Sequence, residues 1–205
     1  MQFMSEFLLL ALVHFLAVVL PGPDFIITVR NSIRYGYFKG TLTALGIGAG
    51  ISIHVIYTLI GVSIIIKHSI WLMSILKVLS AMYLFFLGYK ILINNEKINI
   101  NFELKEQDMS NYHAFSMGFM TNALNPKATI FFLSIFTTLV SVTTPLKIQA
   151  VYGIWMCMVN ALWFIFVAKF FSYSSIREQF LKNINLFEKG MGAGLIILAI
   201  ILLLK

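Results

Sequence analysis

The sequence predicts an all-α integral membrane protein with six transmembrane helices, and three observations lead to this fold class. Hydrophobic residues make up 60% of the 205 residues and charged residues only 11%, whereas a soluble domain is roughly 45–50% apolar and about 25% charged. The apolar residues form continuous runs of about 20 residues, the length that a helix needs to cross a bilayer. The short alternating segments of a membrane β-barrel do not occur. A soluble enzyme, a soluble binding module and a disordered chain are therefore excluded.

The apolar runs place the spans in chain order. They cover residues 3–20, 41–66, 70–93, 112–142, 146–171 and 187–204. No Lys or Arg precedes Arg30, so the first run lacks the basic region of a signal peptide and is expected to remain as a helix. The one long polar stretch, residues 94–111, is expected to link two three-helix halves, residues 1–93 and 112–205, within one membrane domain.

The distribution of Lys and Arg predicts the orientation in the membrane. The net charge is +7, from 15 Lys and Arg against 8 Asp and Glu. The loops after the first, third and fifth spans carry ten basic residues, namely Arg30, Arg34, Lys39, Lys90, Lys97, Lys105, Lys169, Arg177, Lys182 and Lys189. The opposite side carries four, namely Lys67, Lys77, Lys147 and Lys205. The positive-inside rule puts the ten-residue side in the cytoplasm and both termini outside, and membrane orientation explains the charge without nucleic-acid binding.

Each half contains three spans, so the halves are expected to insert with opposite topology, the inverted-repeat arrangement of many secondary carriers. The first helix of each half is also interrupted by a proline break, at Pro21-Gly22-Pro23-Asp24 and at Asn125-Pro126-Lys127. Proline removes a backbone donor and clashes with the preceding turn. A single break of this kind can be a simple kink. Breaks at corresponding positions, each beside a charged residue, favour a binding site built from helix ends.

Asp24 is the acidic residue that lies well inside the apolar framework. A charged side chain at mid-membrane costs roughly 2.5–3.5 kcal/mol on insertion scales, so such a residue indicates function by default. Its carboxylate suits the binding of an ammonium group or the exchange of a proton. The alternative is a structural role as the N-cap of the next helical turn, because Asp24 follows Pro-Gly-Pro.

Three further polar residues lie at the second break. Lys127 can pair with Asp24, hold a substrate carboxylate, or extend its amine to the cytoplasmic face. Asn122 and Asn125 offer amide donors and acceptors near the same position, and Asn125 can equally cap the helix that follows it.

Two histidines lie within the predicted spans. His14 precedes Asp24 by ten residues, close to three helical turns, so the two side chains can share a helix face. His14 and His54 can each relay protons, or each can be a buried residue hydrogen-bonded to a neighbour. Their spacing with Asp24 is not that of a metal site, and the single Cys157 excludes a disulfide within the chain and a multi-cysteine metal site. No metal or cofactor is expected.

Glycines four residues apart recur along the chain. The pairs are Gly36 with Gly40, Gly46 with Gly50, and Gly190 with Gly194. This small-xxx-small spacing allows two helices to approach closely. It serves either the packing of the fold or a homodimer.

Several motifs together suggest a family. In the first half they are Pro21-Gly22-Pro23-Asp24, Arg30-Asn31, Gly36, Gly40, Gly46, Gly50, His54, Tyr83-Leu84, Leu87-Gly88 and Lys90. In the second half they are Phe115, Gly118-Phe119, Asn122, Asn125-Pro126-Lys127-Ala128, Phe131-Phe132, Gly190 and Gly194. In this order, over nearly the whole chain, they resemble the LysE/RhtB family of bacterial amino-acid exporters.

The resemblance implies a six-helix carrier of the bacterial cytoplasmic membrane that exports amino acids by exchange for protons. The family motifs map onto Pro21, Gly22, Pro23, Asp24, Asn125, Pro126 and Lys127. The single evident intramembrane acid favours a neutral substrate such as threonine, homoserine or leucine over a basic one. The expected partners are the amino acid, protons and the lipid bilayer.

Two other functions fit the sequence less well. A metal-ion exporter of related architecture would need several intramembrane carboxylates or thiolates, and the sequence offers Asp24 and one cysteine. A membrane enzyme would need a clustered acid, base or nucleophile, and a scaffold protein would need no chemistry at all. The sequence therefore favours a transporter that is not an enzyme.

Overall fold

The computed structural model describes residues 2–68, 70–93, 109–141 and 143–203, and this part of the chain contains eight α-helices and no strand. The helices are α1 (Gln2–Val19), α2 (Pro23–Tyr35), α3 (Tyr37–His68), α4 (Ile70–Ile93), α5 (Asn111–Ala123), α6 (Pro126–Leu139), α7 (Leu146–Phe171) and α8 (Ser174–Leu203). The predicted all-α class is confirmed. Residues 94–108 of the expected polar linker lie outside the described residues.

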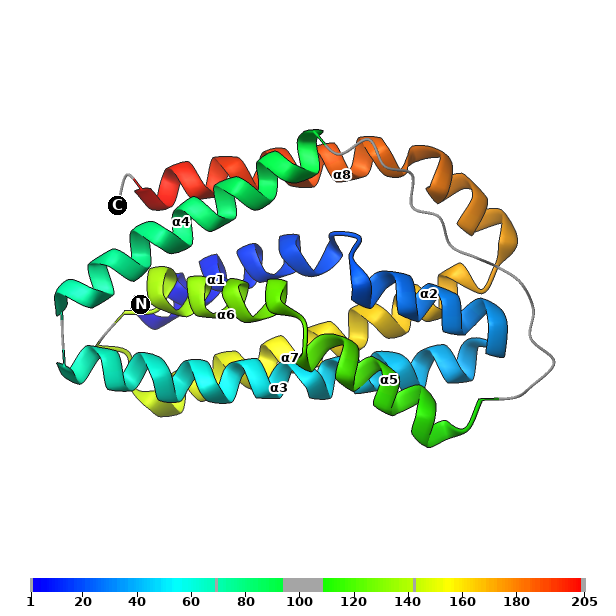
Figure 1. The fold of residues 1–205 in the computed structure, drawn as a ribbon, viewed down its shortest axis with the longest axis horizontal. Coiled ribbons are helices and arrows are strands. Elements are labelled where there is room, and N and C mark those ends of the chain that lie inside the picture. Colours follow the sequence, from blue (N-terminus) through cyan, green and yellow to red (C-terminus); the bar gives the residue numbers. More distant parts are fainter. Residues whose placement is uncertain (1, 69, 94–108, 142, 204–205) are drawn as a thin grey trace.

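The helices pass back and forth along the long axis of the molecule (Figure 1). In that view α1 and α2 run from left to right, α3 returns, and α4 runs to the right again. The counterparts in the second half run the other way: α5 and α6 to the left, α7 to the right, and α8 to the left. As a result, α1 begins and α8 ends at the same end of the molecule.

Two of the described helices are long and apolar enough to cross a membrane, in the ranges Tyr37–Gly61 and Leu146–Phe171. The bent pair of α1 and α2 adds a third span if it is treated as one broken helix. Shorter apolar helical segments occur at Ala81–Ile93, Lys127–Leu139 and Gly192–Ile201. The membrane character is therefore supported, and the six-span arrangement remains a prediction.

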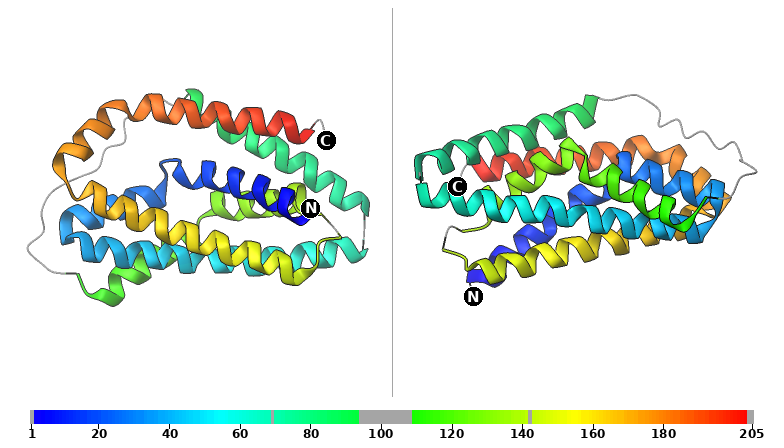
Figure 2. Two further views of the ribbon diagram at one scale, coloured as in Figure 1. Left: turned by 180° about the vertical axis from the view of Figure 1, so that it is seen from behind. Right: turned by 60° about the horizontal axis from the view of Figure 1, so that its bottom comes forward.

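Counterpart helices of the two halves lie side by side. Helix α3 packs along α7, and α4 packs along α8, as two further views also show (Figure 2). Helix α3 also packs against α5. The largest buried cluster lies among α1, α3, α4, α6, α7 and α8 and includes Leu10, Ile51, Leu84, Phe136 and Met156. Three members of this cluster, Ile51, Phe131 and Phe132, also line the cavity at the two helix breaks.

Glycines allow α3 to approach α5 closely. A methyl group at Gly46 would overlap the carbonyl of Phe115 and lie 2.8 Å from the amide nitrogen of Phe119. One at Gly50 would lie 3.0 Å from the Asn122 Cβ atom. Within α2 and α3, a methyl group at Gly40 would lie 2.9 Å from the Cβ atom of Ser32. Larger residues at Gly46 and Gly50 would therefore push α5, which carries Asn122, away from α3.

The other glycines of the predicted pairs behave differently. Gly36 ends α2 with φ of +86°, a conformation that favours glycine, and a methyl group there would meet nothing within 4 Å. Within the described residues, nothing lies within 4 Å of a methyl group placed at Gly190 or Gly194. Close helix approach, expected from the spacing, is therefore not seen at these three positions. At Gly36 the reason is the chain reversal between α2 and α3.

Two helices include residues that no apolar run covers. Residues 23–35 lie between the first two runs, yet they form the 13-residue helix α2, one face of which buries Phe25, Thr28, Val29, Asn31 and Ser32. The sixth run was expected to begin at residue 187, whereas α8 begins at Ser174. An apolar run detects a helix that is hydrophobic all round and misses an amphipathic one.

Candidate functional site

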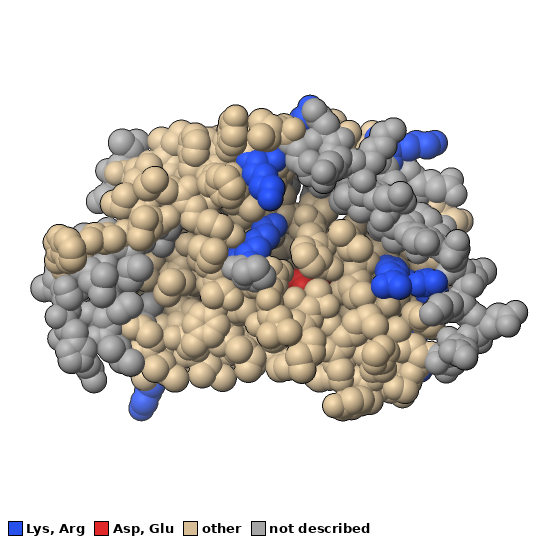
Figure 3. All heavy atoms as spheres, in the orientation of Figure 1, with Lys and Arg blue, Asp and Glu red and all other residues tan. Residues whose placement is uncertain are grey.

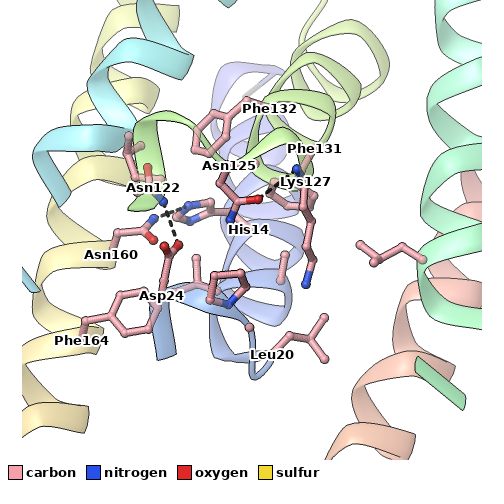
Figure 4. A pocket seen from close by; sticks show the side chains of 17 residues that line it. His14, Leu20, Asp24, Asn122, Asn125, Lys127, Phe131, Phe132, Asn160 and Phe164 are labelled. Carbon is pink, nitrogen blue, oxygen red and sulfur yellow. Dashed lines mark hydrogen bonds between the residues drawn. The ribbon is translucent and has the colours of Figure 1, made fainter. Parts of the chain in front are cut away.

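A cavity of about 70 Å³ lies where the two helix breaks meet. Its volume is sufficient for several water molecules. The polar side chains that line it are His14, Asp24, Asn122, Asn125, Lys127 and Asn160 (Figure 4). The apolar lining includes Ile51, Leu87, Phe131, Phe132 and Phe164. Five of the six predicted binding residues therefore meet in one place, and His54 is the exception.

The first break separates α1 from α2 at Pro21 and Gly22. The two helix axes are bent by 54°. Gly22 is the N-cap of α2 in an extended conformation and makes no side-chain cap hydrogen bond, and Pro23 begins the helix. Asp24 lies in the first turn of α2. The partial positive charge at a helix N-terminus stabilises a carboxylate in this position.

The second break separates α5 from α6. The chain turns at Leu124 and Asn125, where the Asn125 amide donates to the carbonyl of Asn122 at 2.8 Å. Pro126 begins α6, and the Asn125 side-chain oxygen accepts a hydrogen bond from the Lys127 amide at 3.0 Å. Asn125 therefore caps α6, which is one of the two roles that the sequence allows. Lys127 follows in the first turn of the helix.

A hydrogen bond joins the two breaks. The Asn122 side chain donates from Nδ2 to Oδ2 of Asp24 at 2.8 Å, across 98 residues of sequence. The remaining oxygens, Oδ1 of Asp24 and Oδ1 of Asn122, are buried and have no hydrogen-bond partner among the described residues. This pair therefore presents two hydrogen-bond acceptors and one negative charge at the cavity.

Lys127 places a positive charge at the same cavity. Its charge acts favourably on the Asp24 carboxylate, and its Nζ atom lies 3.8 Å from the position of a methyl group at Gly22. Figure 3 shows an acidic side chain recessed in a hollow of the surface, with basic side chains close by. The two breaks thus bring opposite charges to one site.

His14 and Asn160 form a second polar pair on the cavity wall. The Asn160 Nδ2 atom lies 2.9 Å from Nε2 of His14 and also donates to the carbonyl of Met156 at 3.0 Å. Both side chains are buried. The imidazole packs against Phe132 and Trp155, with ring centroids 5.9 and 5.6 Å away. The pair joins α1 to α7 beside Asp24 and Asn122 (Figure 4).

His54 lies outside the cavity lining and supports the second break. Its Nε2 atom is 2.9 Å from the Asn122 carbonyl oxygen, so Nε2 must carry the proton. Its Nδ1 atom is 2.7 Å from the Tyr57 hydroxyl. The ring stacks on Phe132 with centroids 5.6 Å apart. Since both nitrogens are hydrogen-bonded, His54 is placed to position the backbone that carries Asn122.

Asn160 is the site residue that the sequence reasoning missed. It lies within the apolar run that became α7, and an amide in such a run is a signal of the same kind as Asn122 in α5. The described residues contain no group of three or more His, Cys, Asp or Glu side chains that could hold a metal ion. The chemistry of the site therefore rests on one carboxylate, one amine, amides and an imidazole.

The model of the family described as "LysE type translocator" matches residues 15–205 of the chain. The threonine efflux protein of Escherichia coli (strain K12) is 30% identical over 196 residues, covering 92% of this chain and 94% of that protein. The threonine efflux protein of Salmonella typhimurium is 30% identical over 206 residues, covering 93% and 95%. The uncharacterized membrane protein YrhP of Bacillus subtilis is 26% identical over 174 residues, covering 81% of each. No solved structure shows a significant match.

The matched residues include both helix breaks and every cavity-lining residue except His14. The family resemblance predicted from the paired proline motifs is confirmed. The chain belongs to the family of LysE type translocators.

Proposed function

We propose that this protein exports a small neutral amino acid across the bacterial cytoplasmic membrane in exchange for protons. The observation that carries the proposal is the hydrogen-bonded pair of Asp24 and Asn122, which joins two broken helices at a cavity that Lys127 also lines. Helix breaks that meet around charged side chains are typical of the substrate sites of secondary carriers.

The polar groups of the cavity complement the backbone of an amino acid. An ammonium group donates three hydrogen bonds, and the buried oxygens Oδ1 of Asp24 and Oδ1 of Asn122 offer two acceptors for it. The carboxylate of the substrate would turn toward the amine of Lys127. In a zwitterion bound in this way, the ammonium group lies next to a negative charge and the carboxylate next to a positive charge, so little net charge is transferred into the membrane.

A neutral side chain is favoured by the composition of the cavity wall. Asp24 is the one acidic side chain among the lining residues, and it is assigned to the ammonium group. A basic substrate would bring a second cation that no further carboxylate of the lining could neutralise. The relatives from Escherichia coli and Salmonella typhimurium are named as threonine efflux proteins, which is consistent with this assignment.

The single carboxylate also supplies a mechanism for exchange. Asp24 can hold either a proton or the ammonium group of the substrate, because both require the same oxygens. Protonation would release the substrate on the outer side, and loss of the proton on the inner side would restore the charge that binds the next molecule. Coupling would therefore arise from competition at one group, without a second ion site.

We propose that six spans form two inverted halves that rock around this cavity. The counterpart helices run in opposite directions, and α3 with α7 and α4 with α8 lie side by side (Figure 1). The proposal includes the orientation predicted from Lys and Arg, with both termini outside. Helix α1 begins and α8 ends at the same end of the molecule (Figure 1), which supports an even number of membrane crossings.

Counterflow in proteoliposomes tests the function. The purified protein is reconstituted, loaded with unlabelled amino acid, and supplied with labelled threonine, homoserine, leucine, lysine or glutamate, with and without an imposed pH gradient. We expect accumulation of a neutral amino acid that the pH gradient increases. If none of the amino acids is exchanged, the proposal is contradicted. If the pH gradient does not change the rate of exchange, the proposed proton coupling is contradicted.

A further inference from the structure

A carboxylate near the start of α1 holds the chain that connects α6 to α7. The Glu6 Oε2 atom accepts a hydrogen bond from the Ser141 amide at 3.1 Å. The Thr144 hydroxyl donates to the same carboxylate, and its oxygen lies 3.0 Å from both Oε1 and Oε2. These three residues, here named the Glu6 clamp, join the first half of the chain to the second across 135 and 138 residues of sequence. The proposed function does not use them.

Neighbouring contacts hold the same end of α1. The Tyr152 hydroxyl of α7 donates to the Phe3 carbonyl at 2.8 Å. The Gln149 side chain, also of α7, donates to the Thr144 carbonyl at 2.8 Å, so α7 fixes one of the residues that hold Glu6. The start of α1 is therefore bound by two segments of the second half, namely α7 and the chain between α6 and α7.

The Glu6 clamp and the cavity lie at opposite ends of α1 and α6. The clamp lies where α1 begins and α6 ends, whereas the cavity lies where α1 ends and α6 begins (Figure 1). Residue 6 precedes the cavity residue His14 by eight positions, which is about 12 Å along a helix. Side chains of one buried cluster, each at most 1% exposed, fill the interval: Leu10 and Val13 of α1, Ile135 and Phe136 of α6, and Met156 of α7. Packed apolar side chains thus separate the cavity from this end of the molecule.

Transport requires this end to open. A carrier exposes its binding site to each side of the membrane in turn, by moving one half against the other. For the cavity to be reached from this end, α1 must separate from α6 and α7, and the hydrogen bonds of Glu6 must break. A carboxylate suits such a contact, because its hydrogen bonds are stronger than those between neutral groups. Since Glu6 lies near the start of α1, water replaces these bonds when the end opens.

We infer that the Glu6 clamp is a gate, which keeps the cavity closed on this side until the start of α1 separates from the second half. The inference rests on the proposed export, and in the proposed orientation the gate faces the outside. Weakening the clamp should shift the protein toward the form that is open on this side. Water would then reach the apolar side chains between the clamp and the cavity.

A reporter cysteine between the clamp and the cavity tests the inference. Val13→Cys is made in the full chain together with Cys157→Ala, so that the reporter is the only thiol. The purified protein is reconstituted in liposomes, and the rate of labelling by a water-soluble maleimide is measured. Val13 is fully buried, so its labelling reports how often this side opens. We expect Glu6→Ala to increase the rate about tenfold, because hydrogen bonds to a charged group are lost.

Smaller changes to the clamp should have graded effects. Thr144→Val removes the hydroxyl donor, and Glu6→Gln keeps an acceptor oxygen for the Ser141 amide, so we expect both to increase labelling less than Glu6→Ala does. Val29→Cys is the matched control. Val29 is as buried as Val13 but lies in the separate cluster formed by α2, α3 and α7. Its labelling should not rise in any clamp variant.

The outcomes distinguish failure of the inference from failure of the proposed function. If the wild-type protein exchanges no amino acid in counterflow, the proposed function is wrong. If exchange occurs but Glu6→Ala and Thr144→Val leave the labelling of Val13→Cys unchanged, only the inference is wrong. If labelling rises equally at Val29→Cys, the clamp stabilises the whole fold and is not a gate. Should Glu6→Ala fail to reach the membrane, the result for Thr144→Val decides.

Discussion

Each helix break is followed by a helix that begins with a proline, but the two breaks differ in their N-caps and in the charge beside them. A proline begins the helix that follows each break, α2 or α6. At the second break the Asn125 side chain caps the helix, whereas at the first break Gly22 provides no side-chain cap. The first break carries the carboxylate of Asp24 and the second the amine of Lys127.

The two charges also differ in their relation to the helix dipole. A helix N-terminus carries a partial positive charge, so it stabilises Asp24 in the first turn of α2 and disfavours Lys127 in the first turn of α6. Helix α6 by itself therefore does not explain the position of Lys127. The explanation lies across the cavity, where the charge of Lys127 acts on Asp24. We therefore expect that the stability of each break and the charge it presents can be altered separately.

The largest effect is expected from removing the charge at the first break. Asp24→Asn keeps the size of the side chain but removes the negative charge that binds the ammonium group and the proton. We expect exchange to fall on the order of 100-fold, because hydrogen bonds to charged groups contribute about 1.5–3 kcal/mol each. Counterflow, normalised to the amount of protein in the membrane, measures the change. Full exchange by this variant would remove Asp24 from the mechanism.

Removing the charge at the second break should have a smaller effect. Lys127→Gln is expected to raise the KM for the amino acid about tenfold, since the half-buried amine is partly screened by solvent. Lys127→Arg retains the charge and serves as the matched control. Initial rates of exchange over a range of substrate concentrations separate KM from the maximal rate. A KM that is equal in the Gln and Arg variants would show that the charge does not meet the substrate.

The cap of the second break should contribute to stability. Asn125→Ala removes the hydrogen bond to the Lys127 amide and is expected to lower the free energy of unfolding by about 1 kcal/mol. Asn125→Ser keeps an N-cap acceptor and should restore most of the loss. Thermal unfolding in detergent compares the variants. An unchanged unfolding temperature in Asn125→Ala would mean that Pro126 and the packing of α6 suffice to fix the break.

The smallest effect is expected at the equivalent position of the first break. Gly22 has φ of −159° and ψ of −167°, an extended conformation that any residue adopts. The atom nearest to a new methyl group would be Nζ of Lys127 at 3.8 Å, an ordinary contact. We expect Gly22→Ala to change the free energy of unfolding by less than about 0.5 kcal/mol. A loss as large as that of Asn125→Ala would show that the two breaks are more alike than their caps indicate.

Much of the fold and of the site could be predicted from local features of the sequence. The apolar runs predict the helical class, because a lone strand in lipid would leave its backbone groups without partners. The prolines predict both breaks, since they cannot continue a helix without losing a hydrogen bond. The amphipathic helix α2 and the first half of α8 were not predicted, because their polar faces interrupt the apolar runs.

The roles of single site residues were harder to predict. Asp24, Asn122 and Lys127 stand out as polar groups beside the breaks, and the structure brings them together. His14 and His54 look alike in sequence, yet one lines the cavity and the other fixes the backbone at Asn122. Asn160 is likewise an amide within an apolar run, but only its contact with His14 shows that it belongs to the site. An isolated polar residue in a helix does not reveal which neighbour it meets.

The sequence by itself determines that this chain is helical and suited to a membrane, where its helices break, and which charges stand beside the breaks. These properties follow from hydrophobicity and backbone chemistry, which act over a few residues. Only the tertiary structure decides that Asn122 meets Asp24 and that Asn160 meets His14, across 98 and 146 residues of sequence. Those contacts depend on how closely whole helices pack, as α3 and α5 do at Gly46, and close packing is a property of two surfaces together.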